Sequence, residues 1–106
     1  MSKYSGARLR ICPTGGSVAV VMTGNNVQAN DGDALPCKGC LIIGRTTNTG
    51  PVHMNIGAAA SNILGIQVPE SAGAGSPFFV PISDVSQLYF WSNTETDVID
   101  IMYFVG

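Results

Sequence analysis

The sequence predicts an all-β domain, a single antiparallel β-sandwich of about eight short strands. Clusters of Gly, Pro, Asn, Asp and Ser interrupt the chain at short intervals, as residues of tight turns do. The runs between these clusters, about five to eight residues each, are rich in Val, Ile, Phe, Tyr and Thr, which favour strands. No segment carries apolar residues at helical spacing over several turns. The length of 106 residues suits one domain, covering residues 1–106.

The first predicted strand, residues 7–12, places aliphatic side chains on one side and Arg8 and Arg10 on the other. With Lys3, these arginines form the only concentrated positive charge of the chain. Residues 1–12 are therefore interpreted as an N-terminal arm or an edge strand. Such an arm on an otherwise acidic protein is suited to contact an acidic neighbour, and a solvated terminus is the alternative. Arg8 and Arg10 are interface candidates.

The middle of the chain contains two continuously apolar runs, residues 18–22 and 40–43. This pattern is typical of strands covered on both faces, in the centre of a sandwich or at a subunit contact. The next run, residues 52–57, alternates between apolar and polar side chains, and His53 lies on its polar face. A further apolar row follows at residues 64–68.

The C-terminal third holds most of the aromatic residues, in the runs 78–82, 87–91 and 98–105. The last run is apolar on both faces, so we expect it to be a central strand or part of an interface. Tyr103 lies in one of its rows and is an interface candidate.

Tyr89 and Trp91 share one strand face, opposite Leu88 and Phe90. Three interpretations of this aromatic pair stay open: packing in the core, anchors of a protein interface, or a platform on which a sugar stacks. Tyr89 and Trp91 are therefore interface candidates as well. The position of the single tryptophan after all three cysteines does not fit an immunoglobulin domain, so jelly-roll topology is preferred.

Cys37 and Cys40 form a CxxC motif, which is typical of zinc sites when four ligands are available. Cys12 and His53 are the residues that would complete a set of three cysteines and one histidine. No second CxxC pair exists, and Cys40 opens an apolar strand, where cysteine behaves as a small hydrophobic residue. Free buried thiols are the simpler interpretation, so neither a metal nor another cofactor is expected.

Catalytic motifs are missing from the sequence. His53 is the only histidine, no GxSxG sequence presents a serine, and the carboxylates do not have the spacing of a calcium loop. The acidic cluster at residues 30–33 is better explained as turn chemistry. The glycine-rich residues 71–77 lead into a strand and lack the Gly-Lys-Ser/Thr ending of a phosphate-binding loop. The sequence therefore predicts a protein that is not an enzyme.

The composition disfavours nucleic acid and membranes as partners and favours other protein subunits. Only five residues are Lys or Arg and the net charge is −2, which disfavours nucleic acid. No apolar run is long enough for a membrane helix, and no secretory signal pattern follows Met1, so synthesis in a cytoplasm is expected. Charged residues make up 11% and hydrophobic residues 45% of the chain. Because this leaves few charges for the surface, we expect a homo-oligomer or a larger assembly to cover part of it.

Two segments carry a resemblance to a known class of proteins. The first segment, residues 41–57 (LIIGRTTNTGPVHMNIG), has a strand, an Asn-Thr-Gly turn and a second strand that ends in glycine. The second segment, residues 77–91 (PFFVPISDVSQLYFW), has a strand followed by a Leu-Tyr-Phe stretch. Together they resemble small virion proteins of tailed bacteriophages. The resemblance implies a cement or decoration protein that is made in the host cytoplasm and sits on the capsid exterior as a dimer or trimer. There it would stabilise joints between major capsid proteins. A carbohydrate-binding module, or a receptor-binding module of a tail fibre, is the alternative.

Overall fold

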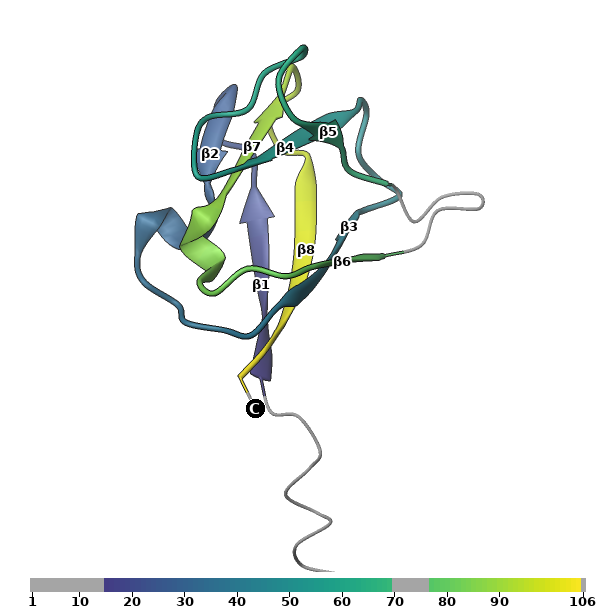
Figure 1. Ribbon diagram of the computed structural model, residues 1–106. Helices are drawn as coiled ribbons and strands as arrows, with labels where there is room; N and C mark the ends of the chain where they lie inside the picture. Colours follow the sequence, from purple (N-terminus) through teal and green to yellow (C-terminus); the bar gives the residue numbers. More distant parts are fainter. Residues whose placement is uncertain (1–14, 70–76, 106) are drawn as a thin grey trace, which may run out of the picture.

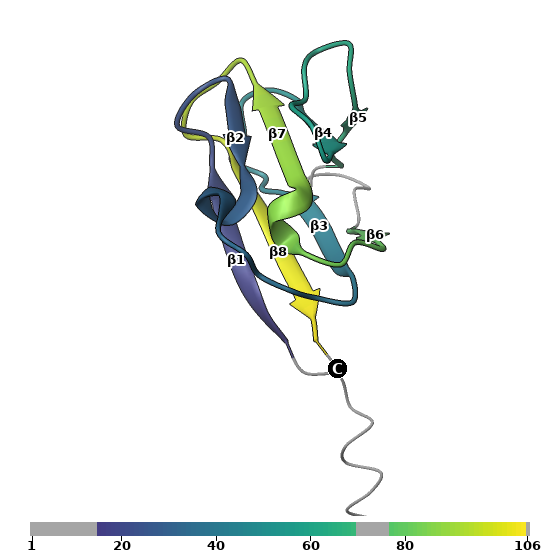
Figure 2. The same ribbon diagram turned by 60° about the vertical axis from the view of Figure 1, so that its left-hand side comes forward.

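The computed structural model describes residues 15–69 and 77–105. It contains eight strands in two four-stranded antiparallel sheets, which face each other as two layers (Figures 1 and 2). This confirms the prediction of an all-β sandwich. The elements are β1 (Gly15–Val21), β2 (Asn26–Gln28), β3 (Cys40–Gly44), β4 (Val52–Ile56), β5 (Ile66–Gln67), β6 (Phe78–Val80), β7 (Leu88–Ser92) and β8 (Val98–Phe104), with 3-10 helices η1 (Ala29–Gly32) and η2 (Val85–Gln87). The strand predicted at residues 7–12 and most of the glycine-rich segment 71–77 lie outside the described residues.

The strand order is β1-β8-β3-β6 in the first sheet and β2-β7-β4-β5 in the second. The first strand in the sequence pairs with the last, the second with the last but one, and so on: β1 with β8, β2 with β7, β3 with β6 and β4 with β5. Two further pairings, β3 with β8 and β4 with β7, complete the sheets. Every connection passes from one sheet to the other except the one between β4 and β5.

The core lies between the sheets. Along β3 and β7 buried side chains alternate with partly exposed ones, as expected when only one face of a sheet is covered. Ile42, Phe90, Ile99 and Ile101 are almost completely buried and form the centre of this core. The fold therefore has two outward faces, one on each sheet.

The continuously apolar runs are buried on one face only, whereas one expectation from the sequence was that the sandwich covers both of their faces. In β1, Val20 is buried whereas Val21 has an exposed fraction of 46%. In β3, Cys40 and Ile42 are buried whereas Leu41 and Ile43 are partly exposed. A two-layer fold covers only the inner face of each sheet, so the outward members of these runs stay on the surface. Their interpretation as a subunit contact stays a prediction.

Candidate functional surfaces

The outward face of the first sheet is apolar at its centre. Register places Met102 opposite both Ser17 and Leu41, and Leu41 opposite Phe79, so these side chains form one row across all four strands. Phe79 and Met102 have exposed fractions of 54% and 50%. With Ile43 they form what we call the outer patch: Leu41, Ile43, Phe79 and Met102. A hollow of about 270 Å³ beside it is lined by Ser17, Leu41, Ile43, Pro77, Asp100, Ile101 and Met102.

Arg45 and Asp100 border the outer patch as a bidentate ion pair. The Nε and Nη2 atoms of Arg45 each donate to one carboxylate oxygen of Asp100 over 2.9 Å. This hydrogen bonding, reinforced by the negative charge of Asp100, raises the pKa of Arg45. Because each charge already has its partner, an apolar surface that covers the border leaves neither charge unpaired.

The outward face of the second sheet is different, because it combines aromatic and amide side chains. Register places Trp91 between Asn26 and His53, while Tyr89 lies in a second row between Gln28 and Asn55. The rings of His53 and Trp91 meet edge to face, with centroids 5.5 Å apart and planes at 60°. The Nδ1 atom of His53 is buried without a hydrogen-bond partner among the described residues.

The aromatic candidates from the sequence lie on two different sheets, and they do not all face outward. Tyr89 and Trp91 lie on the face opposite buried Leu88 and Phe90, as predicted, and this face points outward, so packing in the core is not their role. Tyr103 instead packs against the core from the inner face of β8 and is only partly buried. Its role in an interface stays a prediction, and Arg8 and Arg10 lie outside the described residues.

The structure does not bring the candidate zinc ligands together. Cys37 and Cys40 are buried, and the Cys37 thiol donates to the Ile82 carbonyl over 3.5 Å. Cys40 lies on the inner face of the first sheet, whereas His53 lies on the outer face of the second. Cys12 lies outside the described residues, and within residues 15–69 and 77–105 no three His, Cys, Asp or Glu side chains are grouped as metal ligands are.

Burial, and then the nearby Cys37, raise the pKa of the Cys40 thiol from 9.0 to about 12. In the unfolded chain this thiol ionises near 9, so between pH 9 and 12 the unfolded state loses a proton that the native state keeps. We therefore predict that the Cys40 contribution to stability is fully present below pH 9 and falls by about 1.4 kcal/mol per pH unit above it. Urea unfolding at pH 8 to 11, compared with Cys40→Ala, measures the difference. Parallel pH profiles for the two proteins would contradict the prediction.

Asp84 is a carboxylate with a structural task. It accepts hydrogen bonds from the Leu35 N–H over 2.9 Å and from the Ser86 hydroxyl and N–H over 2.7 and 2.9 Å. These bonds, that of Leu35 first, lower its pKa. With Gln87 it forms a capping box at the start of η2. The perturbed carboxylate therefore holds the chain before β3 against η2, which explains it without catalysis.

Sequence reasoning did not identify the outer patch or a groove beside β1. The groove has a volume of about 280 Å³ and is lined by Val18, Ala19, Val20, Val21, Thr23, Val27, Gln28, Asn30 and Asp31. Asn30 and Asp31 have positive φ angles of 56° and 53°, which short polar turn residues tolerate, and the Asn30 side-chain amide donates to the Asp33 carbonyl over 3.0 Å. The apolar outward residues of β1 and β3 were the signal in the sequence for these surfaces.

Comparison with protein-family models, with curated proteins and with solved structures returned no match. Among the described residues, no helix has the length and apolar character needed to cross a membrane.

Proposed function

We propose that this protein is a structural virion protein, a cement or decoration protein that binds the exterior of a tailed-phage head and stabilises joints between major capsid proteins. The observation that carries the proposal is the outer patch, a group of apolar side chains on three adjacent strands of the first sheet, β8, β3 and β6. An exposed apolar row on a sheet is typical of a surface that another protein covers. Reinforcement of a shell requires such a surface and no catalytic group.

The strand pairing supports this proposal. Pairing of β1 with β8, β2 with β7, β3 with β6 and β4 with β5 is the arrangement expected when one long hairpin is rolled into two sheets. We interpret it as a jelly roll, a topology that is frequent in viral capsid proteins and also occurs in lectins. This is support at the level of fold, and the function depends on the surface.

The chemistry of the outer patch also fits a protein partner. Leu41, Phe79 and Met102 provide large side chains whose burial contributes roughly 1.5–3 kcal/mol each when it is complete. Arg45 and Asp100 neutralise each other at the border. A weak contact of this kind becomes strong when it is repeated around a shell by linked copies, because the second copy binds at a high effective concentration.

The test is binding to tailed-phage heads assembled from a major capsid protein alone, measured by cosedimentation. Phe79→Asp with Met102→Asp is expected to weaken binding by at least about tenfold, because the carboxylates lose hydration in the contact. Ile66→Asp is the matched control, since Ile66 on β5 has a similar exposed fraction of 55% but belongs to the second sheet. Thermal unfolding checks that each variant is folded. Equal binding by the double variant and the control would overturn the proposal, as would failure of the unaltered protein to bind.

Carbohydrate binding is the second candidate, because the outward face of the second sheet combines Trp91, Tyr89 and His53 with amide side chains. Aromatic rings stack on sugars, and amides bind hydroxyl groups. A glycan array distinguishes the two functions. Binding of a glycan that is lost in Trp91→Ala, together with no binding to heads, would favour the carbohydrate function.

A further inference from the structure

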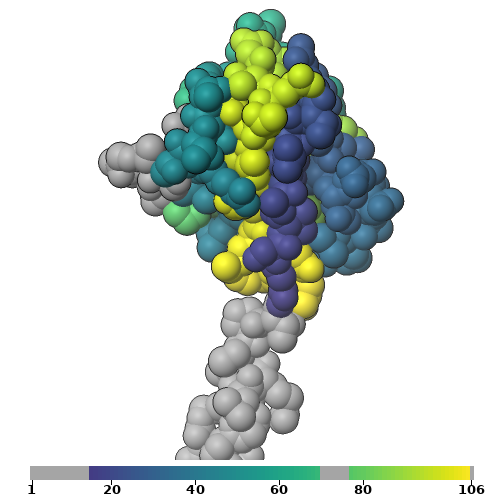
Figure 3. Space-filling view, turned by 180° about the vertical axis from the view of Figure 1, so that it is seen from behind, coloured from purple at the N-terminus to yellow at the C-terminus, as the bar shows by residue number. Residues whose placement is uncertain are grey.

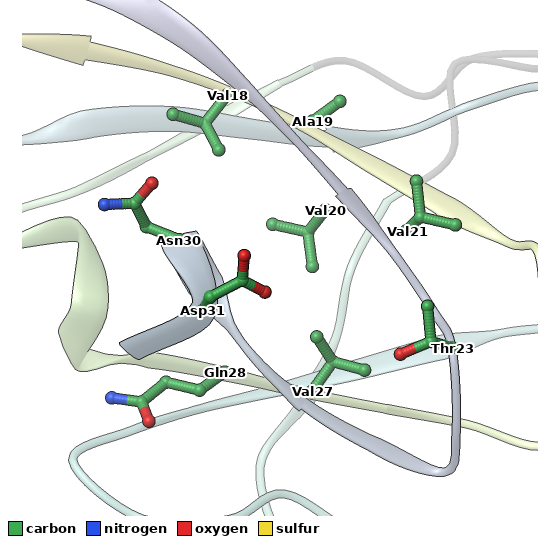
Figure 4. A pocket seen from close by; sticks show the side chains of 9 residues that line it. All are labelled: Val18, Ala19, Val20, Val21, Thr23, Val27, Gln28, Asn30 and Asp31. Carbon is green, nitrogen blue, oxygen red and sulfur yellow. The ribbon is translucent and has the colours of Figure 1, made fainter. Parts of the chain in front are cut away.

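The groove beside β1 lies at an open side of the sandwich, between the edge of the first sheet and the segment formed by β2 and η1. Figure 4 shows Val20 and Val27 pointing into this space, with Asp31 beside them. Val18 and Val27 are only partly buried, although both pack against the core. The groove therefore presents an apolar floor with an acidic side chain at its rim.

β1 is also an unpaired edge. It pairs with β8 along all seven residues, and within the described residues no strand occupies its other side. Figure 3 shows β1 on the surface, between the yellow of β8 and the blue of the residues that follow it. Backbone N–H and C=O groups along such an edge can accept an additional strand, and the side chains of that strand would enter the groove.

Charge indicates which strand fits. The described residues contain two cations, Lys38 and Arg45, and six acidic residues, a formal net charge of −4. Residues 1–14 contain three cations and no acidic residue. Asp31 and Asp33, at and beside the groove, belong to no ion pair within the described part of the chain. The body of the domain therefore attracts the segment that precedes it.

The sequence of that segment matches the groove. In residues 7–12, Leu9 and Ile11 alternate with Arg8 and Arg10. A strand added along β1 would turn the two aliphatic side chains toward the floor formed by the valines and leave the arginines at the solvent side. Period-two alternation of this kind is what the edge of a half-covered sheet requires.

The edge of the same copy is difficult for this segment to reach. Gly15 and Gly16 are already part of β1, opposite Phe104 and Tyr103, so only Pro13 and Thr14 separate it from residues 7–12. Favoured two-residue hairpin turns need a positive φ at their first position. The pyrrolidine ring fixes the φ of proline near about −65°, which excludes these turns.

From these observations we propose that residues 7–12 of one copy add as a strand to the free edge of β1 in a second copy, with Leu9 and Ile11 in the groove. The protein then assembles with itself by exchanging N-terminal arms. This leaves both outward sheet faces free, so self-assembly does not depend on shell binding. The two proposals can accordingly fail separately.

The test compares two double variants of the full chain by sedimentation velocity over a range of concentrations. Leu9→Asp with Ile11→Asp places charge in the groove and is expected to weaken self-association at least about tenfold. Ser2→Asp with Ser5→Asp adds the same charge to the same segment outside the alternating stretch, and is expected to weaken it less. All four positions precede residue 15, where the described residues begin, so neither double variant is expected to change the fold of the sandwich. Thermal unfolding of both variants checks this.

Amide hydrogen exchange provides the second readout. Alternate N–H groups of β1 face the free edge, so they should be protected in the assembled protein and exchange faster in Leu9→Asp with Ile11→Asp. The proposal would be overturned if the unaltered protein is a monomer. If the β1 amides of that monomer are nevertheless protected, residues 7–12 pair with β1 of their own copy. Equal weakening by both double variants would also overturn it, because charge alone would then explain the association.

Discussion

Replacement of Phe90 with alanine is expected to lower the free energy of unfolding by about 3–5 kcal/mol. Phe90 is completely buried on the inner face of β7, between Val27 of β2 and Met54 of β4. Its removal leaves a cavity that neighbouring strands cannot fill without breaking their register. A domain of this size has a total stability of roughly 5–15 kcal/mol, so the expected loss is a large fraction of the total.

Urea unfolding measures the effect, and Trp91→Ala is the matched control. Trp91 is the next residue of the same strand but points outward, where it contacts His53. The control removes a larger aromatic side chain from a partly exposed site, so its cost should be clearly smaller. A cost for Trp91→Ala equal to that for Phe90→Ala would show that the second sheet is covered on both faces, contrary to the two-layer fold.

Which side chains of a strand share a face could be predicted from the sequence, although the choice between core and surface stayed open for Tyr89 and Trp91. Alternation correctly placed Tyr89 and Trp91 on the face opposite Phe90, and it placed His53 on an outward face. This succeeds because the side-chain period of two is a local property of any strand. Continuous apolar runs contain no such signal, and the expectation that residues 18–22 are covered on both faces within the sandwich was accordingly wrong.

The candidate surfaces could not be predicted, because they depend on pairing between distant strands. Leu41 is adjacent to Phe79 and Met102 only because β3 pairs with both β6 and β8. The same limit explains the candidate zinc ligands. The CxxC spacing says nothing about the sheet on which His53 lies, whereas the apolar context of Cys40 correctly indicated a buried thiol. Local patterns thus predicted which side chains of one strand lie on the same face. Pairing between distant strands determined which residues of different strands lie side by side on a surface.

The second large effect is expected at the end of the sandwich where the loop after β3 meets the turn before β8. Asp97 has an exposed fraction of only 2%, and its carboxylate accepts hydrogen bonds from the Thr49 N–H over 3.0 Å and the Ser92 hydroxyl over 3.2 Å. The Thr49 hydroxyl approaches the same oxygen as the N–H, at 3.5 Å. Asp97 therefore links the β3–β4 loop to the turn between β7 and β8, beside the two hydrogen bonds between Asn48 and the Val98 backbone.

Asp97→Ala is expected to lower the free energy of unfolding by about 2–3 kcal/mol, because it leaves the Thr49 N–H and the Ser92 hydroxyl without this acceptor. Urea unfolding measures the change, with Glu95→Ala as the control. Glu95 is an exposed acidic residue in the same turn, so its loss should cost less than about 0.5 kcal/mol. Comparable small losses in both variants would mean that the backbone bonds from Met22 to Asp97 and from Thr96 to Met22, both 2.8 Å long, hold this turn without the carboxylate. A loss confined to Asp97→Ala would instead show that the buried carboxylate stabilises the turn that leads into β8.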